Sequence, residues 1–202
     1  IEIEFWHAMS SSLGEAVDDL VQHFNDSQDE IVVKATFQGS YQDNSNALLA
    51  AFEADTAPNI IQNNALSTQT MIDTGRIIPV WQLMETGGYD PNIFIPAVRD
   101  YYSDEAGLMS MPFNSSTAIV YHNADLFDAA GLEPPDREWT FREFLETCQA
   151  LQAADTPFCV SFSSSGWYLE QFLANGGGLY FDENNGRTGR ATDVRFYEEL
   201  GV

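Results

Sequence analysis

The N-terminal half of the sequence alternates between short apolar runs and longer amphipathic runs, and this alternation limits the fold more than any other feature. The runs at 1–5, 30–37 and 58–62 are rich in β-branched residues and are predicted to be strands. Amphipathic segments over about 12–24 and 40–53 are predicted to be the helices between them. This order favours a parallel sheet with helices on both faces, which is an α/β fold.

Small polar residues mark the predicted helix starts. Ser12-Leu13-Gly14-Glu15 and Thr140-Phe141-Arg142-Glu143 have the spacing of capping boxes, in which two side chains satisfy free amides of the first turn. Ser40 and Ser67 are predicted to cap two further helices. The segment 91–102 is also predicted to be helical.

Three predicted loops follow the carboxyl ends of the strands, at 6–12, 38–41 and 63–67. Ligands of parallel sheets bind at this edge, and the loops are polar and aromatic, as in a binding site. Their residues also have structural explanations. Tyr41 could lie over the strand edge, and His7 could be a hydrogen-bonded loop histidine.

The segment 108–123 has two apolar runs with the polar cluster Asn114-Ser115-Ser116-Thr117 between them. The second run, 118–121, is apolar and β-branched, and it predicts a buried strand. Unpaired buried hydroxyl and amide groups cost about 1–3 kcal/mol each. The cluster must therefore bond either to neighbouring backbone or to a polar ligand.

The second half of the chain repeats the mixture of helix and strand. Helices are predicted over 124–130, from Thr140 onward, over 167–174 and over 193–200, with a strand at 158–162. Cys148 falls in a predicted helix and Cys159 at the start of that strand. Two buried free thiols or a disulfide in an oxidising compartment would both fit this pair.

The charge balance excludes several partners. Lys and Arg number 8 and Asp and Glu 31, so the net charge is 8 − 31 = −23. Nucleic acids and anionic membranes require clustered cations, so neither is an expected partner. We find no apolar run of the roughly 20 residues that a membrane span needs, and no signal peptide. The chain starts directly with a predicted strand, as a mature or trimmed export product would.

Signatures of catalysis are also missing from the sequence. The three histidines are far apart and lack metal spacing, and GxSxG, P-loop and GxGxxG motifs are absent. We therefore expect neither an enzyme nor a cofactor. A calcium site at 182–186 is a weaker alternative, because the segment lacks the spacing of a complete EF-hand loop.

Several motifs occur in an order that points to one family. Four motifs resemble the family 1 extracellular solute-binding proteins of ABC importers. They are Phe5-Trp6-His7, Phe37-Gln38-Gly39-Ser40-Tyr41, Met111-Pro112-Phe113-Asn114-Ser115-Ser116-Thr117 and Asp125-Leu126-Phe127-Asp128-Ala129-Ala130-Gly131-Leu132. Within the family, the resemblance is strongest to members that bind sn-glycerol-3-phosphate. It covers nearly the whole chain.

The resemblance implies a type II periplasmic-binding-protein fold, in which two α/β lobes close around a cleft. It implies lobes at 1–110 and 124–202 and an inter-lobe crossing segment at 111–123. Family members are about twice this length, so the chain would be an N-terminal fragment. The implied protein is a monomer in the periplasm or outside the cell, with a lipid anchor before trimming as one option. It would deliver its solute to the membrane subunits of an importer without entering the membrane.

The resemblance also implies ligand-binding residues. Tyr41, Ser116 and Trp167 match residues that contact the ligand in the glycerophosphate binders. The resemblance places Trp6 and His7 at the border of the cleft, and Asn64 and Ser115 beside the matched positions. Core packing of the tryptophans and turn hydrogen bonding of the serines remain alternatives.

Two departures leave the solute open. Ala65 stands where glycerophosphate binders carry a glutamate that holds the glycerol hydroxyls, and Ser164 replaces a second tryptophan. Asn63 and Asn64 could partly substitute for the glutamate. The expected solute is glycerol-3-phosphate, a glycerophosphodiester or a related polyol or sugar. An oligosaccharide-binding protein of the same fold and, less favoured, a glycoside or phosphodiester hydrolase are the alternatives.

Overall fold

The computed structural model describes residues 1–135, 139–154, 156–163, 165–181, 189–190 and 192–196. It divides into two compact units, Ile1–Ser116 and Thr117–Val202, each of which is described by itself. Most of the predicted helix at 193–200, the calcium-type segment at 182–186 and Ser164 lie outside the described residues.

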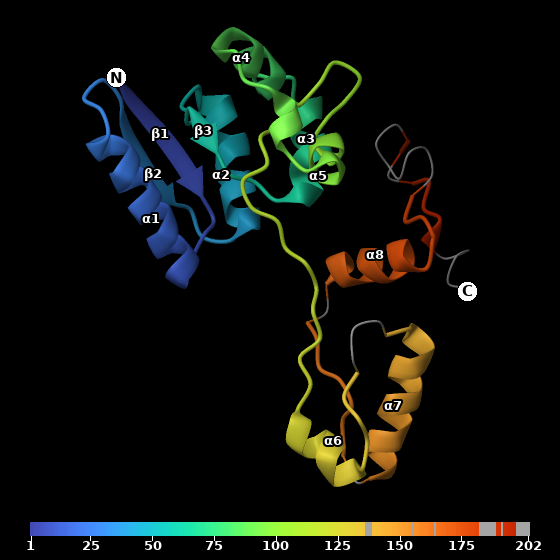
Figure 1. Cartoon of the computed structure of the whole chain (residues 1–202). Coiled ribbons are helices and arrows are strands. Elements are labelled where there is room, and N and C mark those ends of the chain that lie inside the picture. Colours follow the sequence, from blue (N-terminus) through green and yellow to red (C-terminus); the bar gives the residue numbers. More distant parts are fainter. Residues whose placement is uncertain (136–138, 155, 164, 182–188, 191, 197–202) are drawn as a thin grey trace. The chain divides into compact units, whose positions relative to one another are not determined.

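A three-stranded parallel sheet forms the centre of the first unit (Figure 1). Strand β1 (Glu2–His7) lies between β2 (Val32–Phe37) and β3 (Ile60–Ile61), so the predicted parallel sheet is confirmed. The two crossovers carry helices α1 (Ser11–Asp26) and α2 (Tyr41–Ala54). The first crossover runs from β1 to the edge strand β2, and the second runs back from β2 past β1 to β3. Because the two crossovers run in opposite directions across the sheet, right-handed connections place these helices on opposite faces.

The two helix starts in this unit differ. The predicted cap of α2 is confirmed, since the Asp43 amide donates to Ser40 Oγ at 3.2 Å and the Ser40 amide donates to Asp43 Oδ2 at 2.9 Å. The predicted capping box at Ser12 is wrong, because Ser10 holds the N-cap position of α1 and makes no side-chain cap bond. The Gly14 amide donates to the Ser10 carbonyl, so Ser12 already lies inside the first turn.

Short helices complete the first unit: η1 (Ala65–Ser67), α3 (Thr68–Asp73), α4 (Val80–Gly87), η2 (Pro91–Ile93) and α5 (Pro96–Tyr101). The helical prediction over 91–102 is confirmed in part, because η2 and α5 lie within it but are separated by residues 94–95. Residue Ile95 is extended and Pro96 begins α5, as expected because proline disfavours helical backbone in the residue before it. The core of this unit contains Val17, Leu48, Ala51, Met71, Met84, Leu108 and Met109.

The segment 108–123 is only partly buried and does not form the strand predicted within it. Leu108 and Met109 are buried, but 110–123 has no regular secondary structure, and Tyr121 is 89% exposed. The buried strand predicted at 118–121 is therefore wrong. A strand needs a hydrogen-bonded neighbour, and no described segment of the chain pairs with these residues.

The second unit consists mainly of α6 (Ala124–Ala130), α7 (Phe141–Ala153) and α8 (Gly166–Asn175). All three match the predicted helices, and Gly131 ends α6 in the left-handed conformation, with a φ of 66°. The strand predicted at 158–162 is wrong, because this segment is irregular and no backbone hydrogen bond joins it to another described residue.

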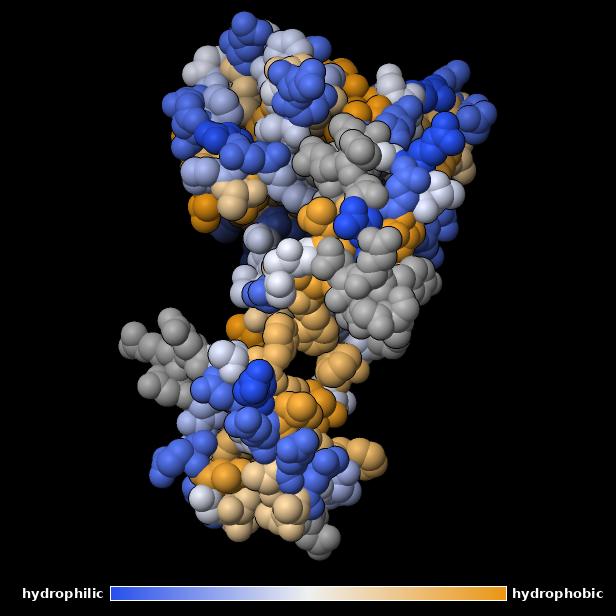
Figure 2. Space-filling view, turned by 90° about the vertical axis from the view of Figure 1, so that its right-hand side faces the viewer, coloured by the Kyte–Doolittle hydropathy of each residue, from blue (hydrophilic) through white to orange (hydrophobic). Residues whose placement is uncertain are grey.

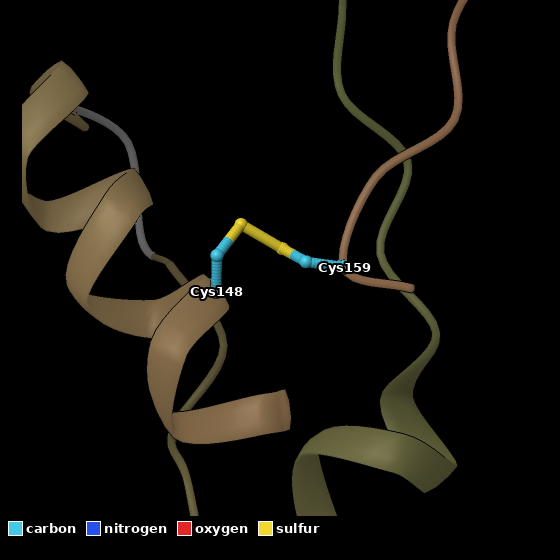
Figure 3. The surroundings of a disulfide bond; sticks show 2 residues. All are labelled: Cys148 and Cys159. Atoms are coloured by element: carbon cyan, nitrogen blue, oxygen red, sulfur yellow. A yellow bond between two sulfur atoms is a disulfide. The ribbon is translucent and has the colours of Figure 1, made fainter. Parts of the chain in front are cut away.

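A disulfide decides between the two alternatives for the cysteines. Cys148 on α7 is bonded to Cys159, and their Cα atoms are 5.1 Å apart (Figure 3). Cys148 is buried, and Cys159 lies in the irregular segment after the helix. The bond therefore fastens this segment to α7, where the sequence predicts a strand.

Hydrophobic side chains reach the surface of both units (Figure 2). In the first unit, Ile93 and Ile95 are each 71% exposed, and in the second unit Phe158 is 80% exposed. None of the described helices is both long enough and apolar enough to cross a lipid bilayer.

Candidate functional site

Gln62 connects the carboxyl ends of the strands in the first unit. It follows β3, and its amide N–H donates to the Trp6 carbonyl of β1 at 2.8 Å. Its side-chain Oε1 accepts the Ala8 amide at 3.0 Å, and its Nε2 donates to the Tyr41 hydroxyl at 3.4 Å. Gln62 is only 6% exposed, so a buried amide supports two of the predicted loops.

Sequence reasoning missed Gln62 because it was assigned to the end of the third strand. The available signal was an amide directly after Ile60-Ile61, at the carboxyl end of a short apolar run. A polar side chain at that place faces the edge where parallel sheets bind ligands.

Tyr41 is the first residue of α2 and is half-buried at this edge. Burial raises the pKa of the Tyr41 phenol, while its hydrogen bond with Gln62 lowers it by a smaller amount. The phenol therefore remains protonated at neutral pH. Its oxygen accepts from Gln62, so the hydroxyl proton can be donated to a solute oxygen.

The start of α2 is already occupied by an acidic side chain. Asp43 Oδ2 accepts both the Ser40 amide at 2.9 Å and the Ser40 hydroxyl at 2.6 Å. These two bonds lower the pKa of the Asp43 carboxyl, so it is ionised at neutral pH. A carboxylate in the first turn offsets the positive end of the helix dipole. An anionic solute would therefore be held by Tyr41 more than by the helix start.

His7 lies at the carboxyl end of β1 and is only 3% exposed. Its ring centroid is 5.6 Å from that of Phe5 and 6.0 Å from that of Phe37. Burial lowers the pKa of His7, against smaller opposite effects of Asp18 and the Met9 backbone. Its Nδ1 is buried and has no hydrogen-bond partner among the described residues. Trp6, its neighbour in β1, is half-buried.

The loop after β3 uses its amides mainly within the protein. Asn63 Oδ1 accepts from Ser45 Oγ at 2.8 Å and from the Asn64 amide at 3.0 Å. Asn64 caps η1, since its Oδ1 accepts the Ser67 amide and the Ser67 hydroxyl. Ser67 holds the predicted N-cap position of α3 but makes no side-chain cap bond there, since its hydroxyl donates to Asn64 instead. The side-chain oxygen of Asn64 is thus engaged, and Ala65 supplies no carboxylate.

The polar cluster begins beside β1. The Phe113 ring lies edge-on to Phe5 with centroids 6.1 Å apart, and Asn114 Nδ2 donates to the sulfur of Met9 at 3.5 Å. Ser115 and Ser116 are exposed, and no hydrogen bond joins their side chains to another described residue. Their hydroxyl groups are therefore available to a solute.

Trp167 belongs to the second unit. It is the second residue of α8, and its amide donates to the capping oxygen Ser165 Oγ at 3.2 Å. The indole is half-buried and its centroid is 5.2 Å from that of Tyr168. That Trp167 and Tyr41 face one cleft stays a prediction, because the two residues lie in different units.

The described residues contain no group of three or more His, Cys, Asp or Glu side chains that could hold a metal ion. The edge of the sheet instead presents amide, hydroxyl and phenol groups. This chemistry suits hydrogen bonding to a polar solute.

Comparison with known proteins identifies the family. Residues 10–200 match the family model of the bacterial extracellular solute-binding proteins. The chain belongs to this family. It is 36% identical over 199 residues to the sn-glycerol-3-phosphate-binding periplasmic protein UgpB of Escherichia coli K12, an alignment that covers 96% of this chain and 45% of the relative. UgpB of Salmonella typhimurium matches over the same shares with the same identity.

Solved structures confirm the two-lobed binding-protein fold class. UgpB from Mycobacterium tuberculosis in complex with glycerophosphocholine is similar with a TM-score of 0.69 and 22% identity, over 77% of this chain and 41% of that chain. The cyclic alpha-maltosyl-1,6-maltose binding protein from Arthrobacter globiformis is similar with a TM-score of 0.70 and 20% identity, over 92% of this chain and 49% of that chain. This chain spans about half the length of the curated relatives that it matches.

Proposed function

We propose that this chain is part of the substrate-binding component of an ABC importer and holds a small polar solute at the carboxyl edge of its sheet. The observation that carries the proposal is the half-buried Tyr41 hydroxyl, fixed by Gln62 at this edge in a chain 36% identical to UgpB. The relatives are binding proteins, which supports a role without catalysis.

In this proposal the solute is held by neutral donors and by stacking. Tyr41, Ser115 and Ser116 donate hydrogen bonds to its oxygens, while Trp6, His7 and Asn64 shape the adjoining edge. Trp167 contributes an indole face, on which the apolar side of a polyol or sugar can stack. In the first unit, the cations Lys34, Arg76 and Arg99 are already bonded to acidic side chains.

Ala65 argues for a solute larger than glycerol-3-phosphate. A carboxylate at this position would accept hydrogen bonds from glycerol hydroxyls, and alanine cannot. UgpB from Mycobacterium tuberculosis was solved with glycerophosphocholine, a glycerophosphodiester, which supports this class. The half-buried indole of Trp167 supports an oligosaccharide as the second candidate, because the apolar face of a sugar ring can stack on an aromatic face.

Calorimetry separates these solutes. The 202-residue chain is titrated with glycerol-3-phosphate, glycerophosphocholine and a maltooligosaccharide, and we expect the diester to bind most tightly. Tyr41→Phe should weaken binding by about 1 kcal/mol, the contribution of one hydrogen bond. Tyr89→Phe is the control, because Tyr89 is 67% exposed and remote in sequence from the edge residues.

Trp167→Ala tests the stacking contact and should weaken binding by about 1–3 kcal/mol. Tight glycerol-3-phosphate binding that Ala65→Glu leaves unchanged would contradict the role given to position 65. Hydrolysis of a diester or glycoside, abolished by one Asp or Glu substitution, would show an enzyme instead.

We also propose that the protein acts outside the cytoplasm as a monomer, and passes its solute to the membrane subunits of the importer. The Cys148–Cys159 disulfide supports this location, since disulfides persist in oxidising compartments. Fractionation of cells that express the natural gene, with detection of the protein in the cytoplasm alone, would contradict it.

A further inference from the structure

Glu170 is a half-buried acidic residue in the middle of α8, the helix that carries Trp167 (Figure 1). Every other Asp and Glu in the described part of the chain is exposed, apart from Asp193, whose carboxylate accepts the Arg190 amide at 3.0 Å. Burial raises the pKa of the Glu170 carboxyl. A protein with a net charge of −23 therefore keeps its acidic side chains in water and withdraws this one in part.

The Glu170 side chain has no partner among the described residues. None of their ion pairs includes it, and no hydrogen bond joins its carboxylate to another described residue. Partial burial of a charge without a partner is unfavourable, and acidic side chains are seldom withdrawn from water unless they are paired. The fold of α8 itself gains nothing from a carboxylate at this position, so a ligand is the more reasonable partner.

The position of Glu170 on α8 relates it to Trp167. The two residues are three positions apart, and Leu173, three positions further on, is only 6% exposed. Residues three apart lie on the same face of a helix, with Cβ atoms about 5–6 Å from each other. Glu170 therefore lies between the half-buried indole and a core leucine, on the face that α8 buries.

We infer that Glu170 accepts hydrogen bonds from neighbouring hydroxyl groups of the solute that stacks on Trp167. The inference rests on the proposed function and adds an acceptor to the donors described there. An indole covers the apolar C–H face of a polyol or sugar, and the hydroxyl groups then project from the edge of the stack. A carboxylate one helical turn away can accept two of them, in charge-assisted bonds that are stronger than neutral ones.

This role compensates for Ala65, which supplies no carboxylate for solute hydroxyls. It also gives a glycerophosphodiester one orientation. The Glu170 carboxylate repels a phosphate group, so the glycerol end belongs beside Trp167 and the phosphate belongs with the donors Tyr41 and Ser116. The glycerol end of a diester and a sugar ring both present adjacent hydroxyl groups, and the choice between them is made by experiment.

Calorimetry of the 202-residue chain compares three solutes: glycerophosphocholine, its analogue with a propyl group in place of glycerol, and a maltooligosaccharide. Glu170→Gln should weaken binding of the hydroxylated solute about tenfold and leave the propyl analogue unchanged, because the analogue has no hydroxyl groups to donate. Loss confined to the diester identifies the glycerol end as the partner, and loss confined to the oligosaccharide identifies a sugar ring. Glu146→Gln is the control, since Glu146 is exposed on α7, and it should change no affinity.

Thermal unfolding separates a binding role from a structural one. Since the carboxylate is partly buried without a partner, Glu170→Gln should not lower the midpoint of unfolding. A lower midpoint, or an equal loss of affinity for the hydroxylated solute and the propyl analogue, would overturn the inference. Unchanged binding in this variant, while Tyr41→Phe and Trp167→Ala weaken it, would overturn the inference and leave the proposed function standing. Failure of the natural chain to bind any of the three solutes would overturn both.

Discussion

The two units of this chain differ in what holds their segments together. In Ile1–Ser116, β1 is paired on both sides, and buried Gln62 and Asn44 join the ends of the strands to α2. In the described part of Thr117–Val202, helices carry the regular structure and a disulfide fastens the irregular segment after α7. A strand such as β1 needs neighbours from distant parts of the sequence. Where they are missing, a covalent bond can provide the constraint.

Removal of a core side chain should have the largest effect, and it should be confined to the first unit. Leu48 is 2% exposed, so Leu48→Ala should lower the free energy of unfolding by about 2–5 kcal/mol through lost burial and a cavity. Leu49→Ala is the matched control, because Leu49 is 42% exposed. Urea unfolding gives the magnitude. Hydrogen exchange that rises equally in α7 would show that the two units unfold together and that the contrast between them is wrong.

Removal of the disulfide should affect the second unit. Replacing Cys148 and Cys159 together by serine should cost about 2–4 kcal/mol, since the bond closes a loop between residues 11 positions apart and limits the unfolded chain. Faster hydrogen exchange of α7 and of 156–163, with β1 unchanged, is the expected pattern. A reducing agent should reproduce it in the natural protein and have no effect on the double variant. Unchanged exchange after reduction would contradict the proposed constraint.

Helix caps allow a direct comparison of the two units, because each unit contains a helix that begins with a capping box. Ser40→Ala and Thr140→Ala should each cost about 1 kcal/mol in thermal unfolding. Ser10→Ala, at an N-cap without a side-chain bond, should cost clearly less. A cost for Ser10→Ala as large as that for Ser40→Ala would contradict the assigned cap geometry.

The caps also predict a dependence on pH. Bonds from Ser40 and Thr140 lower the pKa of Asp43 and of Glu143 in the folded state. Their stabilisation is therefore complete above the unfolded-state pKa values and is lost as the pH falls through the lower folded values. The two alanine variants should lose less stability on acidification than the natural protein does.

The smallest expected effect concerns His7. Its folded-state pKa lies below the ordinary value of 6.5, chiefly because the ring is buried. The unfolded chain therefore binds a proton first as the pH falls below about 6.5, and stability decreases from there toward the folded-state pKa. Unfolding followed between pH 8 and pH 5 should show this decrease, and His7→Gln should reduce it. An identical pH profile in His7→Gln would exclude His7 as its source.

Local sequence patterns were sufficient to predict the structure of a segment whose hydrogen bonds are formed within that segment. The helices at 124–130 and 167–174 and the caps at Ser40 and Thr140 were predicted correctly, since caps and helical periodicity are written in neighbouring residues. The parallel sheet followed from the order of elements. The strands at 118–121 and 158–162 were wrong, because β-branched composition does not show whether a partner strand is present.

The sequence by itself determined the α/β class, most helices, the acidic surface and the family, because each depends on local patterns or on motifs in a fixed order. Only the tertiary structure decided that Gln62 fixes Tyr41 and that Cys148 pairs with Cys159. The physical reason is distance along the chain. A hydrogen bond between residues 21 positions apart, such as that from Gln62 to Tyr41, depends on how the sheet brings loops together, and neighbouring residues do not encode it.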